Sequence, residues 1–394
     1  MKILYYSPHP TINMAAPSGP GTHIREIVSA FEKSGHTVVK LISGGETLGT
    51  GVQSQIQFKR RTIKKFIPNI LWQTLKDWKL LQFDGYNRLE LTKLIERERP
   101  DVIYERGYYL MSSGFEVAKQ FDIPYFCEIN APYLEEKKSM EGNSFFLGRA
   151  YSIEKRQMES SKCVFVVSTA LKDYLIKRSS IDPDKIVVTP NAVNLQNIKI
   201  DSSQIAAIQA KLNYTDENII IGFVGSIFPY HGVDTLLRAF KNLYTEGNTK
   251  LRLLIVGDGE ILPELKTYVS QNSLNDIVCF TGNIPHNNVF NYISIMDIAV
   301  MARSNWYGSP VKIFEYGALG KRIVAPDVIP VRDVMEPEID GILVGDNKDA
   351  LINALSRMIE DHEGSGRMAK HFEEKVLNNY TWQKIGDRIL QHMI

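Results

Sequence analysis

A lysine and a glutamate lie three positions apart in the segment YGSPVKIFEYGALGKRIVAP, which covers residues 307–326. Ser309 and Pro310 predict a helix start, with the hydroxyl as N-cap and proline at the first helical position. Lys312 then falls in the first turn, where the helix dipole opposes a cation by roughly 0.3–1 kcal/mol. A bound anion would remove this conflict, because helix N-termini commonly bind phosphate. The segment therefore predicts an anion site at Lys312, with Glu315 on the same helix face.

A second candidate loop is VGSIFPYHGVDTLLRAF, residues 224–240. Gly225 and Ser226 follow a strand-like run, and His231 stands at the start of a helical pattern. Backbone amides and a nearby cation in such a loop can hold a diphosphate. For His231 taken alone, a hydrogen bond at the helix start is the alternative interpretation.

Two further strand-to-helix turns could approach a ligand. In FTGNIPHNN, residues 280–288, Asn283 and Ile284 could give backbone contacts to a nucleobase, although such a turn needs no ligand. In SGPGTH, residues 18–23, Gly21 would let the backbone approach an anion closely, and a plain tight turn is the alternative. SGPGTH is not a GxGxxG motif, so dinucleotide binding is poorly supported.

Polar groups fall at the ends of two other strand-like runs, YERGYY at 104–109 and CEINAPYLEEK at 127–137. These groups, Glu105, Arg106, Glu128 and Asn130, cannot all be buried without partners. Either they pair with one another or they contact a polar substrate. Glu128 joins Lys312 and His231 as a candidate catalytic residue. The candidates for acceptor binding are His23, Glu105, Arg106 and Asn130.

The stretch at 58–83 holds seven Lys or Arg residues against one Asp, with Trp72 and Trp78 among its apolar residues. This composition is typical of an interfacial helix on an anionic membrane. A surface helix packed against its own sheet is the alternative.

The whole chain has 394 residues, a net charge of +1, 44% hydrophobic and 23% charged residues. This balance gives no argument for a nucleic-acid partner. Its three cysteines lie in apolar runs without CxxC spacing, so we expect reduced core residues in a cytoplasmic protein. We expect neither a signal peptide nor a membrane-spanning helix.

Short apolar strand patterns alternate with helical patterns along the chain, and the series restarts near residue 219. Gly320 predicts the end of the helix that carries Lys312, and a buried strand follows it. Such alternation predicts an α/β fold of two doubly wound domains with parallel sheets. We expect ligands at the carboxyl ends of the strands, in the cleft between the domains.

Together these segments resemble family 4 of the retaining, nucleotide-sugar-dependent glycosyltransferases with the GT-B fold, and the resemblance covers nearly the whole chain. GPGTHIREIVSAFEKSGHTV is similar to the family's first-domain loop and helix. FVGSIFPYHGVDTLLRAF, LLIVGDGE, FTGNIP and SPVKIFEYGALGKRIVA are similar, in order and spacing, to its donor site. The resemblance implies two Rossmann-like domains. Residues 1–194 would bind the acceptor, 195–377 the nucleotide sugar, and 378–394 would cross back to the first domain.

The family pattern has two glutamates eight positions apart. Glu315 matches the second, which in the family binds the donor ribose, whereas Tyr307 stands where the first would fall. Ser226 and His231 stand where an arginine and a lysine usually bind the diphosphate. The resemblance therefore implies that Lys312 serves as the phosphate partner. His231 is the nearest further candidate by sequence, and we expect it to help most when protonated. The donor-binding candidates are Gly21, Gly225, Ser226, His231, Asn283, Ile284, Ser309, Pro310, Lys312 and Glu315.

The resemblance implies transfer of a hexose from a nucleotide diphosphate to an acceptor hydroxyl with retention at the anomeric carbon. Same-face attack, with the departing phosphate taking the acceptor proton, requires no protein nucleophile. We expect no metal site and no cofactor, a UDP-sugar rather than a GDP-sugar as donor, and a sugar, lipid-linked or small-molecule acceptor. Two alternatives are a non-hydrolysing sugar-nucleotide epimerase and a non-catalytic nucleotide-sugar-binding protein on the same scaffold.

Overall fold

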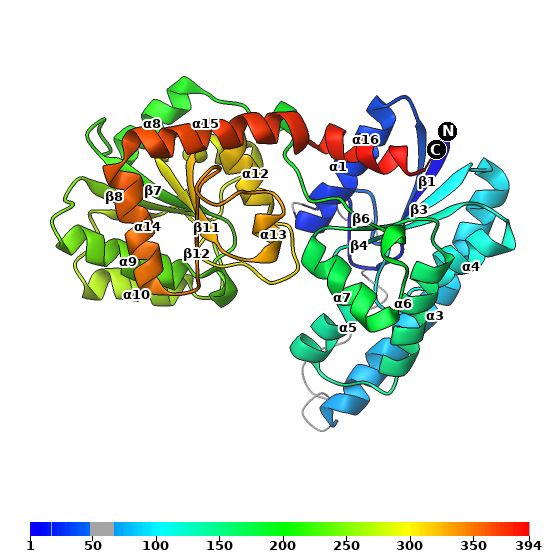
Figure 1. Cartoon of the computed structure of the whole chain (residues 1–394). Helices are drawn as coiled ribbons and strands as arrows, with labels where there is room; N and C mark the ends of the chain where they lie inside the picture. The colour runs from blue at the N-terminus through cyan, green and yellow to red at the C-terminus, as the bar shows by residue number, and fades with distance from the viewer. Residues whose placement is uncertain (17, 48–66, 394) are drawn as a thin grey trace. The chain divides into compact units, whose positions relative to one another are not determined.

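The chain divides into two compact units in the computed structural model, which describes residues 1–16, 18–47 and 67–393 (Figure 1). The first unit comprises Met1–Pro190 together with Trp382–Ile394, and the second comprises Asn191–Thr381. From the sequence we expect these boundaries after residue 194 and before residue 378.

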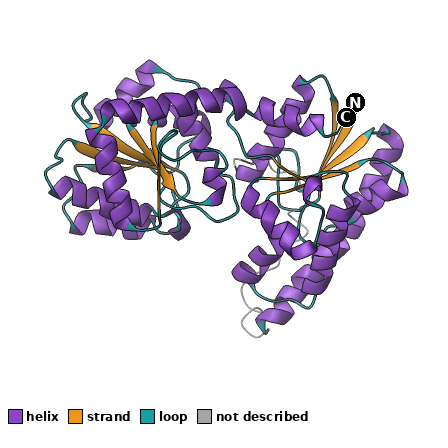
Figure 2. Ribbon diagram, viewed as in Figure 1, coloured by secondary structure: helices purple, strands orange, loops and turns teal. Residues whose placement is uncertain are grey.

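A sheet of six parallel strands, in the order β2-β1-β3-β4-β5-β6, forms the centre of the first unit. Most of its strand residues are buried, as expected for a parallel sheet with helices on both faces (Figure 2). The strands are β1 Lys2–Ser7, β2 Thr37–Ile42, β3 Val102–Arg106, β4 Tyr125–Ile129, β5 Val164–Val166 and β6 Ile186–Val188. The helices are α1 Gly19–Lys33, α3 Asn69–Glu98, α4 Ser113–Gln120, α5 Tyr133–Glu136, the π-helix η2 Lys137–Glu141, α6 Leu147–Ser160, α7 Thr169–Ser179 and the short η3 Pro183–Lys185.

The chain returns to the first unit through its last helix, α16 Trp382–Gln391, which packs against α1. The apolar face of α16 is buried at Trp382, Ile385 and Ile389. The Trp382 ring lies edge-on to the His23 ring of α1, with 4.9 Å between the ring centroids. This helix therefore contributes to the core of the unit in which the chain begins.

The second unit repeats the plan with a sheet of six parallel strands in the order β12-β11-β10-β7-β8-β9. Its strands are β7 Ile219–Val224, β8 Leu251–Val256, β9 Val278–Phe280, β10 Ile298–Val300, β11 Arg322–Pro326 and β12 Ile342–Val344. Its helices are α8 Ser202–Leu212, α9 Val233–Thr245, α10 Leu262–Gln271, α11 His286–Ser294, α12 Val311–Ala318, α13 Ile329–Arg332, α14 Lys348–Glu360 and α15 His362–Asn379, with short turns η4 Leu195–Asn197 and η5 Pro229–His231. The predicted pair of doubly wound parallel domains is thus confirmed.

Each sheet reverses its direction of growth at one pair of neighbouring strands. In the first unit this switch lies between β1 and β3, and in the second it lies between β7 and β10. The loops that follow two such strands leave toward opposite faces of the sheet, which opens a crevice above the carboxyl ends. The loop with Gly225 and His231 follows β7, and the loop that leads to Ser309 follows β10.

The cysteines are free, with Cys127 and Cys163 buried and Cys279 partly buried. Within the described ranges, no helix is both long enough and apolar enough to cross a bilayer.

Candidate active site

The helix that carries Lys312 begins one residue later than the sequence predicts. α12 starts at Val311, Pro310 occupies the N-cap position, and no side chain caps the helix. Ser309 instead uses its hydroxyl oxygen to accept the Asn191 backbone N–H at 3.0 Å, and its carbonyl oxygen accepts from the Asn191 amide at 2.6 Å. The predicted Ser309 cap is therefore wrong, because that hydroxyl holds the first residues of the second unit in place.

The end of the same helix agrees with the prediction. Gly320 has a φ of +59°, in the left-handed region that glycine adopts without strain. Its N–H donates to the Gly317 carbonyl, and the Lys321 N–H donates to the Tyr316 carbonyl, which are the two bonds of a Schellman motif. The motif stops α12 and directs the chain into β11.

The Lys312 amine is buried at the first turn of α12, although the residue as a whole is partly exposed. Its nitrogen lies over the Phe223 ring, 4.1 Å from the centroid, and has no hydrogen-bond partner in the described part of the chain. Burial lowers the pKa of Lys312 to about 7, against the opposing effect of Glu315. A buried amine with unused donors is costly unless a ligand satisfies it, so this position is suited to an anion.

Gly225 lies directly beside that amine. Its φ is +139°, and a Cβ at this position would lie 2.8 Å from the Lys312 nitrogen. A Cβ on Gly257, from the neighbouring loop after β8, would meet the Gly225 carbonyl oxygen at 2.0 Å. The loop after β7 therefore needs glycine both for its backbone conformation and for the close approach of its neighbours.

His231 is held by the same loop through a bond from its Nδ1 to the Ser226 carbonyl. Because a carbonyl can only accept, Nδ1 carries the proton and Nε2 is left as an acceptor. Burial and the Lys312 charge together lower the pKa of His231 to about 4. The expectation of a protonated His231 is therefore wrong for the protein without ligand, since a second cation beside Lys312 is disfavoured.

Glu315 lies one helical turn beyond Lys312 and is largely buried, at 8% exposure. The two side chains are close enough for Glu315 to act on the lysine electrostatically. Tyr307, which replaces the family's first glutamate, is partly exposed in a turn where Asn305 accepts its backbone N–H. Its ring lies edge-on to the Trp306 ring, with 5.2 Å between the centroids.

The remaining donor candidates have weaker geometric support. Asn283 is exposed and Ile284 packs partly against the core, both in the turn after β9. Gly21 lies in α1 of the first unit, where a Cβ would meet the backbone carbonyls of Asn13 and Ala16 at 2.8 and 2.6 Å. Packing alone thus requires glycine at position 21, and the donor contacts of these three residues remain predictions.

In the first unit, Glu128 is the centre of a buried polar cluster. Arg106 donates to it at 2.6 Å, the Tyr104 hydroxyl donates at 2.6 Å, and His23 Nε2 lies 2.9 Å away. Asn130 donates to the same carboxylate. These partners, with His23 and Arg106 foremost, hold the pKa of Glu128 well below its ordinary value despite burial. Mutual pairing, one of the two interpretations, therefore describes Arg106, Glu128 and Asn130.

Glu105 does not join this cluster. It lies on β3 next to Arg106, and successive strand residues point to opposite faces of the sheet. Its carboxyl group accepts from Tyr125 at 2.7 Å and from Gln157 at 2.9 Å, and burial raises its pKa to about 8. The expected grouping of Glu105 with the other polar residues is therefore wrong, because the pleat of the strand separates them.

Two residues of the donor region were missed by the sequence analysis. Phe223, at the end of β7, supplies the ring beneath the Lys312 amine. Tyr316 accepts the Val224 N–H at 2.8 Å through its hydroxyl, which ties α12 to β7. In the sequence both residues look like ordinary core aromatic residues. Only their position in the structure shows that they belong to the donor region.

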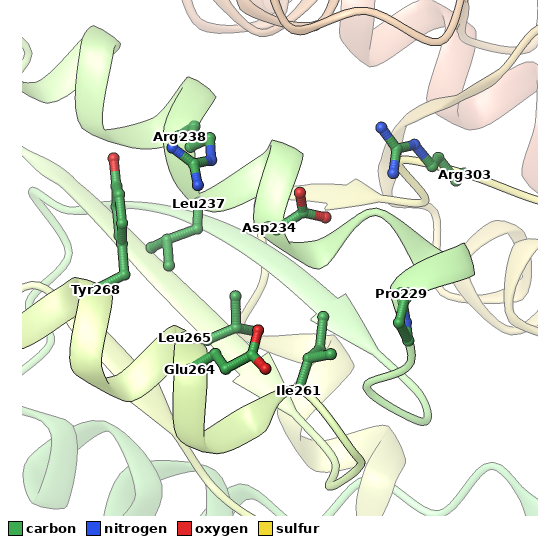
Figure 3. A pocket seen from close by; sticks show the side chains of 9 residues that line it. All are labelled: Pro229, Asp234, Leu237, Arg238, Ile261, Glu264, Leu265, Tyr268 and Arg303. Atoms are coloured by element: carbon green, nitrogen blue, oxygen red, sulfur yellow. The ribbon is translucent and has the colours of Figure 1, made fainter.

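A cavity of about 290 Å³ lies elsewhere in the second unit, between α9 and α10 (Figure 3). Figure 3 shows Tyr268 at one end and Pro229 and Arg303 at the other. Its lining in the described chain is Pro229, Asp234, Leu237, Arg238, Ile261, Glu264, Leu265, Tyr268 and Arg303, and includes none of the predicted donor residues. The formal charges of Arg238 and Arg303 in its wall are offset by those of Asp234 and Glu264.

Two known protein families match this chain. Residues 17–197 match the family described as Glycosyltransferase Family 4, and residues 204–375 match Glycosyl transferases group 1. Together the two matches take in most of both units. Both matches are to glycosyltransferase families, and together they support a family 4 glycosyltransferase.

Sequence relatives agree with this class. The chain is 24% identical over 314 residues to the Escherichia coli UDP-Gal:alpha-D-GlcNAc-diphosphoundecaprenol alpha-1,3-galactosyltransferase, with 78% of each chain covered. It is 22% identical to alpha-D-kanosaminyltransferase of Streptomyces kanamyceticus, with 60% of this chain and 61% of that one covered. An uncharacterized glycosyltransferase of Methanocaldococcus jannaschii is 24% identical, and the match spans 58% of its length. Several curated relatives are thus matched over little more than half their length.

Solved structures show the same architecture. Sucrose-phosphate synthase of Thermosynechococcus elongatus superposes with a TM-score of 0.74 at 20% identity, covering 99% of this chain and 97% of that one. Anabaena HepE, solved in complex with UDP, gives a TM-score of 0.72 at 14% identity, covering 100% and 99%. The GT-B fold is confirmed. The family matches favour a transferase over the epimerase and the non-catalytic binding protein.

Proposed function

We propose that the protein transfers a hexose from a nucleotide-diphosphate sugar, with UDP favoured over GDP, to an acceptor hydroxyl with retention at the anomeric carbon. The E. coli relative's name specifies a UDP-galactose donor and a lipid-linked acceptor, and HepE was crystallised with UDP and with UDP-glucose. These names support a UDP-sugar donor here. A lipid-linked, sugar or small-molecule acceptor is compatible with the same relatives.

The roles we propose follow the geometry of α12 and the loop after β7. Lys312 would neutralise the diphosphate, whose negative charge grows as the glycosidic bond breaks. Backbone N–H groups at the start of α12 would add donors. Glu315 would accept from the ribose hydroxyls, and Nε2 of neutral His231 would accept from a hydroxyl of the transferred sugar. The departing phosphate would take the acceptor proton, so no metal, cofactor or protein nucleophile is proposed.

One observation carries this proposal: the Lys312 amine is buried at a helix N-terminus without a hydrogen-bond partner in the described chain. The direct test is incubation of the full chain with labelled UDP- and GDP-sugars, with and without an acceptor panel of methyl glycosides and polyprenyl-diphosphate sugars. Transfer, or slow donor hydrolysis with an α-configured product, is expected. Interconversion of two nucleotide sugars would instead identify an epimerase, and binding without turnover a non-catalytic protein.

We also propose that the protein, as a cytoplasmic enzyme, contacts the inner face of a membrane through the first unit. The basis is an apolar surface on α3, formed by Ile70, Leu71, Leu75 and Trp78, which are 38–48% exposed. Phe145, 69% exposed, lies beside them because its N–H donates to Thr74 of α3 at 3.1 Å. Trp72 is buried whereas Trp78 is exposed, so the described part of the stretch 58–83 has one packed face and one exposed face. Residues 58–66 lie outside the described residues.

Co-sedimentation with vesicles tests this contact. The wild-type protein should bind vesicles that contain 30% phosphatidylglycerol more tightly than neutral vesicles, and the double change Leu71→Ser, Trp78→Ser should weaken that binding. Leu89→Ser, on the same helix at 61% exposure, is the matched control. Equal binding by the double variant and the wild type would exclude this surface as the membrane contact.

A further inference from the structure

Three aromatic rings lie in a row in the first unit. The His9 and Tyr108 ring centroids are 3.8 Å apart with an interplanar angle of 56°, and the Tyr108 and Tyr133 centroids are 4.9 Å apart at 49°. All three residues are partly exposed. We call them the aromatic row. Their contacts fix the rings against one another while part of each remains accessible.

The row lies at the carboxyl edge of the sheet, where the fold places ligands. His9 follows β1, Tyr108 follows β3 and Tyr133 opens α5 after β4. These strands are adjacent in the sheet, and the step from β1 to β3 is the point at which the sheet reverses its direction of growth. Open α/β sheets bind ligands in the crevice at this switch point.

Two buried donors without partners lie next to the row. Arg106 Nε and the Tyr5 hydroxyl have no hydrogen-bond partner within the described residues, and the two residues are 7% and 0% exposed. The Arg106 charge acts on both His9 and Tyr133, which places the guanidinium close to the row. Buried polar groups are normally satisfied, so these donors indicate a missing polar partner.

The charge balance around the row disfavours an anion. Arg106 is already paired with Glu128 at 2.6 Å. Burial and the Arg106 charge lower the pKa of His9 to about 4, so this ring is neutral near pH 7. Glu136 and Glu141 are near enough to act electrostatically on Tyr108. A phosphate would therefore meet carboxylates here, and the charge of Arg106 is already paired.

We infer that the aromatic row is a stacking surface for a neutral sugar ring of the acceptor, with Arg106 Nε donating to one of its hydroxyls. A pyranose has an apolar C–H face that packs on aromatic rings and a rim of hydroxyls that satisfies buried donors. The inference rests on the proposed function, since it names the part of the acceptor that the first unit binds. It assigns the acceptor sugar to His9, Tyr108 and Tyr133.

The test uses the full chain with methyl α-D-glucopyranoside, methyl α-D-galactopyranoside and methyl N-acetyl-α-D-glucosaminide as probes, and glycerol 3-phosphate as the anionic comparison. Binding is followed by saturation-transfer difference NMR and titration. The variants are Tyr108→Ala and Tyr133→Ala, with Tyr108→Phe retaining the ring. Tyr86→Ala, a 53% exposed tyrosine stacked on Phe83 of α3, is the matched control.

At least one neutral glycoside should bind, and each alanine change in the row should weaken it about three- to tenfold. Tyr108→Phe and Tyr86→Ala should bind like the wild type. Unchanged binding by Tyr108→Ala and Tyr133→Ala, stronger binding of glycerol 3-phosphate, or no binding of any glycoside would each overturn the inference.

The melting shift produced by UDP is measured on the same samples. It should be equal in all variants, which shows that each is folded and that its donor site is intact. Absence of any UDP effect in the wild type, with glycoside binding retained, would count against the proposed function and leave the aromatic row as a sugar-binding surface without an acceptor role. An intact UDP effect without glycoside binding would count against this inference alone.

Discussion

The Lys312 amine lies over the face of the Phe223 ring, 4.1 Å from its centroid. A desolvated cation–π contact of this kind contributes about 2 kcal/mol, which compensates for part of the cost of burying an amine. Unlike a hydrogen-bond acceptor, the ring leaves all three N–H donors of the Lys312 ammonium group unused. Phe223 can thus stabilise Lys312 in the empty site while its N–H groups stay available for a diphosphate.

The change Lys312→Met should stabilise the protein without ligand and impair turnover. Methionine keeps the stem packed on Phe223 and removes the buried charge. Because the pKa of Lys312 is lowered from 10.5 to about 7, the folded state holds this proton less firmly than the unfolded state does. Its destabilising effect is therefore full below pH 7 and fades as the pH rises to about 10.5.

Melting temperature should rise in Lys312→Met more at pH 6.5 than at pH 10, while kcat with saturating donor falls roughly 10²–10³-fold. Lys266→Met, an exposed lysine of α10, is the control. A large fall in melting temperature with near-normal turnover would mean that Lys312 is structural and that the donor site lies elsewhere.

UDP affinity should depend on pH through the same amine. Above pH 7 the empty site holds an increasingly neutral Lys312, so binding of the diphosphate must take up a proton. Affinity should then fall between pH 7.5 and 9.5, by up to about tenfold per pH unit. UDP itself is fully ionised in this range, since a terminal phosphate has its second pKa near 6.

Isothermal titration in buffers of different ionisation enthalpy measures both the affinity and the proton uptake. Lys312→Arg is the decisive comparison, because arginine stays charged across this range. Its affinity should not fall between pH 7.5 and 9.5. The same pH dependence in wild type and Lys312→Arg would assign the titration to another group.

The change Glu105→Gln should stabilise the first unit increasingly as the pH rises. Burial raises the pKa of Glu105 from 4.5 to about 8, so between these values the folded protein keeps a proton that the unfolded chain loses. Stability of the wild type therefore falls with pH in this window, by up to roughly 1.4 kcal/mol per pH unit from this group. Glutamine cannot ionise and escapes this loss.

Denaturant unfolding at pH 5, 7 and 9 measures the effect as the difference in unfolding free energy between variant and wild type. The difference should grow from pH 5 to pH 8 and then level off. Glu96→Gln, an exposed carboxylate on α3, should show no such trend. A pH-independent difference for Glu105→Gln would mean that Glu105 is ionised in the folded protein.

The layered fold was predictable because it depends on local patterns: continuous apolar strands, helical spacing and turn glycines such as Gly320. The helix start at Ser309 was not, because the competing partner is Asn191, 118 positions earlier in the chain. The separation of Glu105 from Arg106 was implicit in the two-residue period of a strand. The neutral state of His231 depends on burial and on Lys312, and neither is visible in the spacing of the residues.

The change Glu315→Gln should weaken nucleotide binding if Glu315 accepts from the ribose. Loss of a charge-assisted hydrogen bond costs roughly 1.5–3 kcal/mol, or about 10–150-fold in affinity. Glu315 is 8% exposed and lies one turn beyond Lys312, so its carboxylate has little solvent to replace a ribose hydroxyl. Titration with UDP measures the effect, and Glu374→Gln, an exposed carboxylate on α15, is the control.

A second ligand separates a ribose contact from a general loss of structure. In the wild type, 2′-deoxy-UDP should bind more weakly than UDP, because it lacks one hydroxyl that Glu315 would accept from. In Glu315→Gln the two ligands should bind with more nearly equal affinity, since the partner of that hydroxyl is already weakened. If Glu315→Gln lowers the affinity for both ligands by the same factor, the carboxylate does not contact the 2′-hydroxyl. Its effect on binding would then act through Lys312, whose charge it supports.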